Sequence, residues 1–412
     1  MAKTKRRDSS RVILCKGEFQ RPNGTYQYSW TDDNGKRRFI YGKTLDELRE
    51  KERQISKDKA EGIKSESRFL TVNDMFEKWR DLKRGLKDNT FSNYVYMYNM
   101  FVRDTFGQNR LSSLKKTDVK RFYNTLVDSR GLKANTLDNV HTVLHQVLEM
   151  AVDDDYIRSN PSDNVMRELK QAYGLKTEKR RALTLPEQTL FLNYLSRNNA
   201  NSHWFPIFAF LLATGLRVGE ATGLRWCDVD LDEGFVDINH TLVYSAHRLP
   251  GYREGCYYSI NSPKTRSSVR QVPLVDFARK ALELERECQE GLELKCTSEI
   301  DGYTDFVFLN RFGAVHNECS LNRALKRIIR DCNNEEFEKE ADPPVLLPNF
   351  SCHTLRHTFT TRMVEKGVNI KVIQDVLGHG DIATTMNIYA DVTKELKKSE
   401  IECIEHFFYN NY

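Results

Sequence analysis

The pattern of apolar residues changes abruptly at Asn160-Pro161, and this change argues against one compact core for the whole chain. Residues 71–161 have helical periodicity, and one side of the last helical segment carries only apolar residues: Leu137, Val140, Leu144, Val147, Leu148 and Ala151. That helix cannot continue past residue 160, because a residue that precedes proline disfavours helical backbone. A chain of 412 residues also exceeds what one hydrophobic core usually supports. We therefore expect separate domains.

The chain on either side of this break predicts two different kinds of domain. Gly, Asn and Ser signals divide the part before it into four helical segments, which predicts a helical domain at residues 69–163. Residues 166–182 are basic and poorly periodic, and we interpret them as the interdomain linker. Residues 176–395 then mix an apolar helix pair broken by glycines, strands around a Pro-Lys-Thr turn, and further helices. The acidic stretch 331–344 is expected to be a solvated loop.

The N-terminal residues predict a small sheet. Residues 11–43 contain three short strand patterns separated by two Asn-Gly turns, and Tyr26, Tyr28 and Trp30 share one side of the second strand. A charged helix follows at 44–62, on which some of the aromatic side chains of the sheet are expected to pack. The fold class is therefore α+β multidomain: a small three-stranded sheet plus helix, a helical domain, and a mixed, mainly-α domain with a small β-sheet.

Charge and composition indicate an intracellular protein with a polyanionic partner. Residues 1–62 hold 16 Lys and Arg against 10 Asp and Glu, whereas the whole chain has a net charge of only +5. Clustered positive charge is typical of nucleic-acid contact, although a solvated terminus explains it equally well. The expected contacts lie beside the turns of the sheet, at Arg21, Lys36, Arg37 and Arg38.

The cysteines and the N-terminus point to the same compartment. The nine cysteines are odd in number and contain no C-x-x-C pair, which favours reduced thiols that fill buried space. No secretory signal or membrane-spanning run is present in the sequence, so we expect a cytoplasmic protein.

The motif HTLRHTF at residues 353–359 contains two histidines with the spacing of a helical zinc site. Zinc proteases with this spacing carry Glu directly after the first histidine, where this chain has Thr354, and a cation at Arg356 would repel a metal ion. The same spacing recurs in HTVLH, where we interpret His141 and His145 as ordinary helix positions. The spacing therefore gives no reason to expect a metal.

An arginine between two histidines suits phosphoryl transfer instead. Guanidinium binds phosphate oxygens bidentately, and a neighbouring imidazole can move a proton. Further residues with suitable chemistry occur in ATGLRVGE, SPKTRSS, VLGHGD and TTMNIYAD, and these residues are Arg217, Lys264, His379 and Tyr389. Taken singly, each has an ordinary structural explanation, because such side chains are commonly solvated or half-buried.

The ordered blocks ATGLRVGE, SPKTRSSVRQVPL, HTLRHTFTT and VLGHGDIATTMNIYA resemble the tyrosine recombinase, or phage integrase, family. They match its Arg–Lys–His–x–x–Arg–His–Tyr signature in order and context. The chain as a whole is similar to integrases of conjugative transposons, which have a small N-terminal arm-binding domain. The resemblance covers residues 1–395 and is strongest at 205–226 and 345–391.

This resemblance implies a role for each residue of the signature. Tyr389 would attack the scissile phosphate, form a 3′-phosphotyrosine and release a 5′-hydroxyl. Arg217 and Arg356 would clamp the nonbridging oxygens. His353 would exchange the tyrosine proton, Lys264 would protonate the leaving oxygen, and His379 would donate a hydrogen bond. His357 is expected to support the helix. No metal, nucleotide or other cofactor is expected, because the covalent intermediate conserves the phosphodiester energy.

The resemblance also implies an organisation and partners. Residues 1–62 would bind arm sites on DNA, 69–163 would be the core-binding domain, and 176–395 would be the catalytic domain. The tail, 396–412, has an apolar stripe that would dock onto a neighbouring subunit or onto its own domain. The implied assembly is a homo-tetramer on double-stranded DNA that passes through a Holliday junction, with an excisionase or a DNA-bending protein as a further partner. Such an enzyme would associate with the bacterial nucleoid when active.

Three other functions fit parts of the same pattern. A type IB topoisomerase has the same chemistry but needs neither an arm domain nor a docking tail. A resolvase of chromosome or plasmid dimers usually lacks the extra N-terminal sheet. A DNA-binding repressor with an inactive site would not need every catalytic position of the family, and here all of them are filled.

Overall fold

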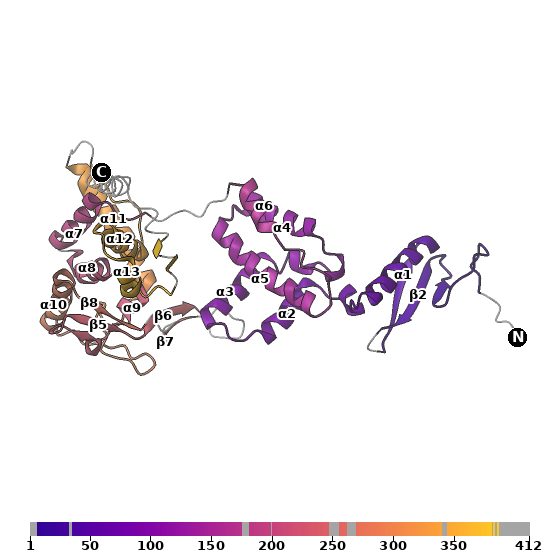
Figure 1. Cartoon of the computed structure of the whole chain (residues 1–412), viewed down its shortest axis with the longest axis horizontal. Helices are drawn as coiled ribbons and strands as arrows, with labels where there is room; N and C mark the ends of the chain where they lie inside the picture. The colour runs from indigo at the N-terminus through magenta and orange to yellow at the C-terminus, as the bar shows by residue number, and fades with distance from the viewer. Residues whose placement is uncertain are drawn as a thin grey trace, which may run out of the picture. The chain divides into compact units, whose positions relative to one another are not determined.

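A computed structural model describes residues 6–32, 35–174, 181–198, 200–246, 255–261, 269–339, 344–380, 382–383 and 385–386 (Figure 1). The chain divides into two compact units, and the division falls between residues 174 and 181. The first unit contains the N-terminal sheet and the helical domain. The second, which we call the C-terminal domain, is described from residue 181 onward. Lys264, Tyr389 and the predicted docking tail lie outside the described residues.

The N-terminal sheet is antiparallel and three-stranded, as the sequence predicts. Its strands, in the order β1-β2-β3, are Glu18–Gln20, Tyr26–Thr31 and Arg37–Gly42. Helix α1, Leu45–Ala60, lies along one face of the sheet (Figure 1). Leu48 of α1 is fully buried against Tyr26, and the ring of Tyr28 stacks on that of Trp30 at 5.8 Å. The predicted packing of sheet aromatics on this helix is therefore confirmed for Tyr26 and Tyr28.

The helical domain contains the four predicted helices. They are α2 Val72–Leu82, α3 Asp88–Phe101, α4 Lys116–Arg130 and α5 Ala134–Asp153. Short 3₁₀ turns also occur before or between these helices, at Ser65–Arg68, Phe106–Gln108 and Leu111–Ser113. The C-terminal domain has similar turns at Ser202–Trp204 and Trp226–Asp228. The whole apolar stripe of α5 is buried in one core with residues of α2, α3 and α4.

The predicted linker is wrong over its first part. Residues Val165–Ala172 form helix α6, and Val165, Met166 and Leu169 are buried in the core of the helical domain. The charged side chains between these positions, Arg167 and Glu168, obscure a helical spacing that nevertheless buries one face. The helical domain therefore extends about ten residues beyond the predicted boundary at 163.

The C-terminal domain is mainly helical and carries small antiparallel sheets. Its helices are α7 Leu185–Arg197, α8 Phe205–Thr214, α9 Val218–Thr222, α10 Asp276–Gly291, α11 Glu318–Glu338, α12 Cys352–Glu365 and α13 Ile370–Leu377. Its strands are β4 Val229–Asp230, β5 Phe235–Ile238, β6 Thr241–Ala246, β7 Cys256–Asn261 and β8 Arg270–Pro273, arranged as β4-β5-β8 and β6-β7. Helix α8 is buried almost all round because α10 and α12 pack on it.

Two further expectations for this domain are wrong. The acidic segment predicted as a loop continues α11 to Glu338, because Cys332 extends the buried stripe of Ile328 and Ile329 by one turn. Most of the described cysteines are also not buried filler. Only Cys332 and Cys352 are buried, whereas Cys15, Cys227, Cys256, Cys288 and Cys319 are exposed. Within the described residues, none of the helices combines the length and the apolar character that a membrane span requires.

Candidate active site

Arg217 stands at the start of α9, directly after the glycine turn that ends α8. Gly215 has a φ of 64°, and a Cβ atom there would lie 2.3 Å from the ring of Phe359, so both conformation and space require glycine. The backbone N–H and Nη1 of Arg217 donate to the Glu220 carboxylate at 2.9 and 2.7 Å. The Arg217 side chain nevertheless remains 41% exposed. The turn therefore holds the Arg217 guanidinium through Glu220 and leaves part of the side chain accessible to solvent.

Arg356 lies in the first half of α12 and is only 4% exposed. Its Nη1 donates to the carbonyl oxygen of Gly215 and its Nη2 to that of Leu377, both at 2.8 Å. Burial, together with repulsion from Arg217, lowers the pKa of Arg356 to about 9. The side chain is therefore still a cation at neutral pH, and it links α12 to the α8 turn and to the end of α13.

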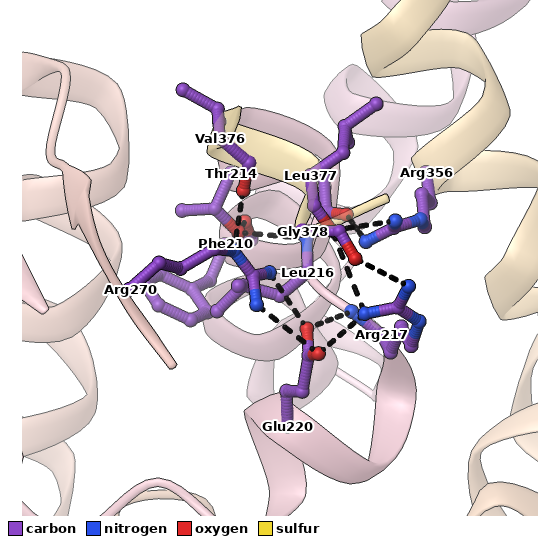
Figure 2. Close-up of polar contacts among 11 residues, drawn as sticks. Phe210, Thr214, Leu216, Arg217, Glu220, Arg270, Arg356, Val376, Leu377 and Gly378 are labelled. Carbon is purple, nitrogen blue, oxygen red and sulfur yellow. Dashed lines mark hydrogen bonds and ion pairs between the residues drawn. The ribbon is translucent and has the colours of Figure 1, made fainter. Parts of the chain in front are cut away.

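Three arginines from different elements converge on the C-terminal end of α13 (Figure 2). The last carbonyl groups of a helix lack intrahelical partners and carry the negative end of the helix dipole. Each of three successive carbonyl oxygens accepts from a different arginine: Val376 from Arg270 at 2.6 Å, Leu377 from Arg356 at 2.8 Å, and Gly378 from Arg217 at 3.2 Å. This helix end therefore gathers positive charge from β8, α12 and the α8–α9 turn.

One buried carboxylate partly balances these cations. The Glu220 side chain is 3% exposed and the Arg270 side chain 7% exposed, and Nη2 of Arg270 donates to Oε2 of Glu220 at 2.9 Å. Burial alone would raise the pKa of Glu220, but the hydrogen bond from Arg270 and the charges of Arg270 and Arg217 lower it. The cluster therefore consists of three cations and one anion, a formal charge of +2 that suits a phosphate group.

Glu220 and Arg270 are absent from the set of site residues expected from the sequence, although each carries a signal. Glu220 stands three residues after Arg217 at the start of a helix, which is the position of the acidic residue in a capping box. Arg270 stands two residues before the buried Val272 on β8. Because side chains two apart in a strand point to the same face, Arg270 lies on the buried face.

His379 follows directly after this helix end. Its Nδ1 and Oγ1 of Thr385 lie 2.9 Å apart, and its backbone N–H donates to the carbonyl oxygen of Gln374 at 3.1 Å. Burial, followed by the positive charges of Arg356 and Arg217, lowers the pKa of His379 to about 4. The imidazole is therefore neutral at physiological pH, where it can donate or accept a hydrogen bond but carries no charge.

The structure brings together three of the six residues predicted from the sequence: Arg217, Arg356 and His379. His353 lies one turn before Arg356 on α12 and is exposed, whereas His357 is half-buried on the same helix. Lys264 and Tyr389 fall outside the described residues, so their positions relative to the cluster remain predictions.

The second histidine pair, on α5, has a different environment. The rings of His141 and His145 stack at 5.4 Å, and Nδ1 of His141 lies 2.9 Å from the Tyr123 hydroxyl. Ligand atoms of His145, Glu149 and Asp163 lie within 4.8 Å of one another. The amide nitrogen of Asn160, however, contacts both Glu149 and His145, at 2.7 and 3.0 Å. His145, Glu149 and Asn160 therefore serve as hydrogen-bonding partners of one another at the end of the helical domain.

The four basic residues predicted to contact DNA lie in different environments on the N-terminal sheet. Arg21, Lys36 and Arg37 are exposed, and the guanidinium groups of Arg21 and Arg37 lie over the rings of Tyr41 and Phe39. Arg38 instead pairs with Asp32 at 2.7 Å and lies over the ring of Phe69. A DNA contact by Arg38 would require it to leave both partners.

Comparison with known protein families gives two matches along the chain. The sequence pattern described as the phage integrase family matches residues 181–395, and that of the DNA-binding domain of Tn916 integrase matches residues 2–59. Among curated proteins, the transposase from transposon Tn916 of Enterococcus faecalis is 30% identical over 97% of this chain and 96% of its own length. The transposase from transposon Tn1545 of Streptococcus pneumoniae has the same identity and coverage.

Solved structures agree with these matches. The Tn1549 transposon integrase in complex with transposon right-end DNA has a TM-score of 0.70 at 26% identity, and the match covers 82% of this chain and 100% of that one. A lambda integrase tetramer bound to a Holliday junction has a TM-score of 0.51 at 17% identity, covering 90% of this chain and 94% of that one. This second likeness shows a shared fold alone.

Proposed function

This chain belongs to the phage integrase family of tyrosine recombinases, and we propose that it cuts and rejoins DNA at the ends of a mobile element, through a 3′-phosphotyrosine intermediate and a Holliday junction. The observation that carries this proposal is the convergence of Arg217, Arg356 and His379 at the end of α13. The element would be excised from one DNA site and integrated at another without metal or ATP.

The charge of the cluster matches the charge of the reaction. A phosphodiester carries one negative charge, and it gains a second as the attacking oxygen adds to phosphorus. A site with a formal charge of +2 stabilises this second charge when its donors are already oriented. The carbonyl oxygens at the end of α13 orient Arg217 and Arg356 before any DNA binds.

The remaining roles rest on the match to the family motif. Tyr389 is the proposed nucleophile. Because an ordinary tyrosine has a pKa of about 10, its ionisation at neutral pH costs about 4 kcal/mol, and the site must offset this cost. His353 is the proposed proton acceptor, and Lys264 the proposed donor to the 5′ oxygen. The neutral His379 donates a hydrogen bond to a nonbridging oxygen.

The other parts of the chain would bring DNA segments together. We propose that residues 1–62 bind arm sites through the exposed face of the sheet, where Arg21 and Arg37 lie beside Tyr41 and Phe39. The helical domain and the C-terminal domain would hold the core site. Four subunits, linked by the tail at 396–412, would exchange strands, and an excisionase or a DNA-bending protein would set the direction. The reaction would take place in the bacterial cytoplasm, on nucleoid DNA.

The test begins with the DNA sequence. Junctions between element and chromosome are mapped in cells that express the protein with its flanking DNA, and the mapped sequence is built into a nicked duplex that traps the covalent complex. We expect wild-type protein to form an adduct that survives SDS, and Tyr389→Phe to bind the duplex without forming it. An adduct formed by Tyr389→Phe would show that another residue is the nucleophile.

Two controls sharpen this experiment. Tyr303→Phe removes the hydroxyl of a half-buried tyrosine elsewhere in the C-terminal domain, and we expect it to form the adduct at the wild-type rate. Addition of EDTA should leave the wild-type rate unchanged, and a strict requirement for a divalent metal would contradict the mechanism.

Deletion of residues 1–62 should weaken binding to arm-site DNA while sparing cleavage of the core site.

A further inference from the structure

Arg270 is the third arginine of the cluster, and it is much less exposed than Arg217. Its side chain is 7% exposed, against 41% for Arg217. Nε donates to the carbonyl oxygen of Val376 at 2.6 Å, and Nη1 and Nη2 donate to the two carboxylate oxygens of Glu220 at 3.3 and 2.9 Å. All three nitrogens therefore bind groups of the protein itself (Figure 2).

The guanidinium also packs directly on the turn that precedes His379. A Cβ atom at Gly378 would lie 2.9 Å from Nη1 of Arg270, and Gly378 has a φ of 63°. The absence of a side chain at this position thus allows the guanidinium to approach the backbone closely. Any displacement of Arg270 would therefore move the turn at Gly378 and the imidazole of His379 that follows it.

We propose that Arg270 is a positioning residue for strand cleavage: it fixes Glu220 and the C-terminal end of α13, and through them sets Arg217 and His379 against the scissile phosphate. This inference rests on the proposed function of the same site. In this proposal Arg270 does not contact DNA itself, because its three guanidinium nitrogens already bind Val376 and Glu220. It acts through two partners, a carboxylate on α9 and a carbonyl group on α13.

The charge balance explains why such a residue is needed. Glu220 is buried, and its carboxylate accepts from both Arg217 and Arg270. Without Arg270, the full charge of Glu220 would act on Arg217 alone and hold its Nη1 away from a phosphate oxygen. Arg270 neutralises the carboxylate from the opposite side, so the charge of Arg217 stays available to DNA.

The position of Arg270 in the chain adds a second link. It is the first residue of β8, the strand that follows the segment containing Lys264. Its bonds to Glu220 and Val376 anchor that end of the strand to α9 and α13. One side chain therefore connects the elements that carry Arg217 and His379 with the strand that leads away from Lys264.

The experiment separates cleavage from binding on the nicked duplex, using Arg270→Met and Arg270→Lys. Misplacing reacting groups by about 1 Å can slow a reaction about 100-fold, and we expect Arg270→Met to cleave about 100-fold more slowly per folded molecule. Its affinity for the duplex should stay within about threefold of wild type, because a positioning residue acts on the bound complex. Arg270→Lys keeps the charge without the two-pronged contact, and its rate should fall between those of Arg270→Met and wild type.

A matched control tests whether the loss of any buried ion pair has this effect. Arg225 pairs with Asp228 at 2.9 Å in the same domain, with a side chain 24% exposed. Arg225→Met should lower thermal stability while the folded fraction cleaves at the wild-type rate. A wild-type rate in either Arg270 variant would overturn the proposal, and so would a loss of affinity as large as the loss of rate.

A double variant tests whether Arg270 acts through Glu220. If it does, Arg270→Met combined with Glu220→Gln should be about as slow as the slower single variant, since coupled residues are not additive. Losses that multiply would show that Arg270 acts independently of Glu220, against the proposal. The two hypotheses also fail differently: absence of a covalent adduct in wild-type protein contradicts the proposed function, whereas equal rates in wild type and Arg270→Met contradict the role of Arg270.

Discussion

Two helices of this protein carry histidines four residues apart, and only one of them enters the candidate active site. Helix α5 contains HTVLH and helix α12 contains HTLRH, so the two motifs place Leu144 and Arg356 at the same point between the histidines. Both side chains are buried, at 0% and 4% exposure. Leu144 packs within the apolar core of the helical domain, whereas Arg356 donates to carbonyl groups of two other elements.

The comparison shows that the residue between the histidines carries the information. The histidine spacing fixes only which side of the helix the imidazoles share. A buried leucine is expected wherever a helix contributes to a core. A buried arginine carries a large desolvation cost, so it persists only where partners and a function retain it. Arg356 has such partners, the carbonyl groups of the α8 turn and of α13, and they hold it in the candidate active site.

The largest effect is expected when the two motifs are made alike. Arg356→Leu gives α12 the residue that α5 has at this position, and removes a proposed donor to the transition state. Loss of one such donor typically slows a reaction about 100- to 1,000-fold, so we expect adduct formation on the nicked duplex to fall by about that factor. Circular dichroism should show that the helices remain.

Arg362 provides the control for this variant on the same helix. It donates to Gln188 at 3.2 Å and pairs with Glu365, so Arg362→Leu also removes a partly buried cation from α12. We expect this control to lose stability and keep the wild-type cleavage rate. A rate for Arg356→Leu within tenfold of wild type would mean that the arginine that distinguishes HTLRH from HTVLH does not contribute to catalysis.

The corresponding change in α5 should affect stability and leave the chemistry intact. Leu144 is fully buried, and replacing a buried leucine by alanine typically costs about 2–5 kcal/mol through lost contacts and a cavity. We expect Leu144→Ala to lower the free energy of unfolding of the helical domain by about this amount in urea titrations. The exposed Leu82, the last residue of α2 in the same domain, offers a control, since Leu82→Ala should change this free energy by less than about 0.5 kcal/mol. A slower cleavage step in Leu144→Ala at saturating DNA would contradict the assignment of α5 to packing.

Much of the fold could be predicted from the sequence, because local periodicity encodes it. The stripe of α5 and the aromatic face of β2 are patterns within one element, and both are found as expected. Helix α6 and the end of α11 were missed for a common reason. In both, charged residues stand between the buried positions, as between Met166 and Leu169, and average composition then resembles a loop.

The site could be predicted only where a motif marks it. Arg217, Arg356 and His379 lie in recognisable blocks, and the structure brings them together. Glu220 and Arg270 lie fifty residues apart in the chain, and their importance comes from the contact between them. Such a pairing depends on how the tertiary fold brings Glu220 of α9 to the first residue of β8, which no local pattern in either segment reports. The capping position and the strand period indicate burial at these residues but do not indicate the partner.

A third prediction compares the histidines of the two regions by pH. Burial lowers the pKa of both His141 and His379 to about 4, with a further contribution from His145 in the first case and from Arg356 in the second. An unfolded histidine, with a pKa of about 6.5, therefore binds a proton before the folded one. These groups leave stability intact above pH 6.5 and reduce it as the pH falls toward 4.

Imidazole NMR with labelled histidine measures this directly. Both residues should remain neutral at pH 6, and Arg356→Leu should raise the pKa of His379 while leaving that of His141 unchanged. The thermal midpoint of wild-type protein should fall between pH 6.5 and 5, by about 2–4 °C for each kcal/mol lost. Titration of His379 near 6.5 in wild-type protein would show that neither burial nor the cation cluster lowers its pKa.

The smallest effects are expected at the second histidine of each motif. His145 lies 2.9 Å from the Ser162 hydroxyl, and His357 is half-buried on α12, so each is expected to support its helix. Replacing either by glutamine should cost about 1 kcal/mol of stability, the usual contribution of one hydrogen bond, and should change the cleavage rate by less than about threefold. If His357→Gln slowed cleavage as strongly as Arg356→Leu, all of HTLRH would act as one catalytic unit. The histidines of HTLRH would then differ in function from those of HTVLH, and Arg356 alone would no longer account for the difference between the two motifs.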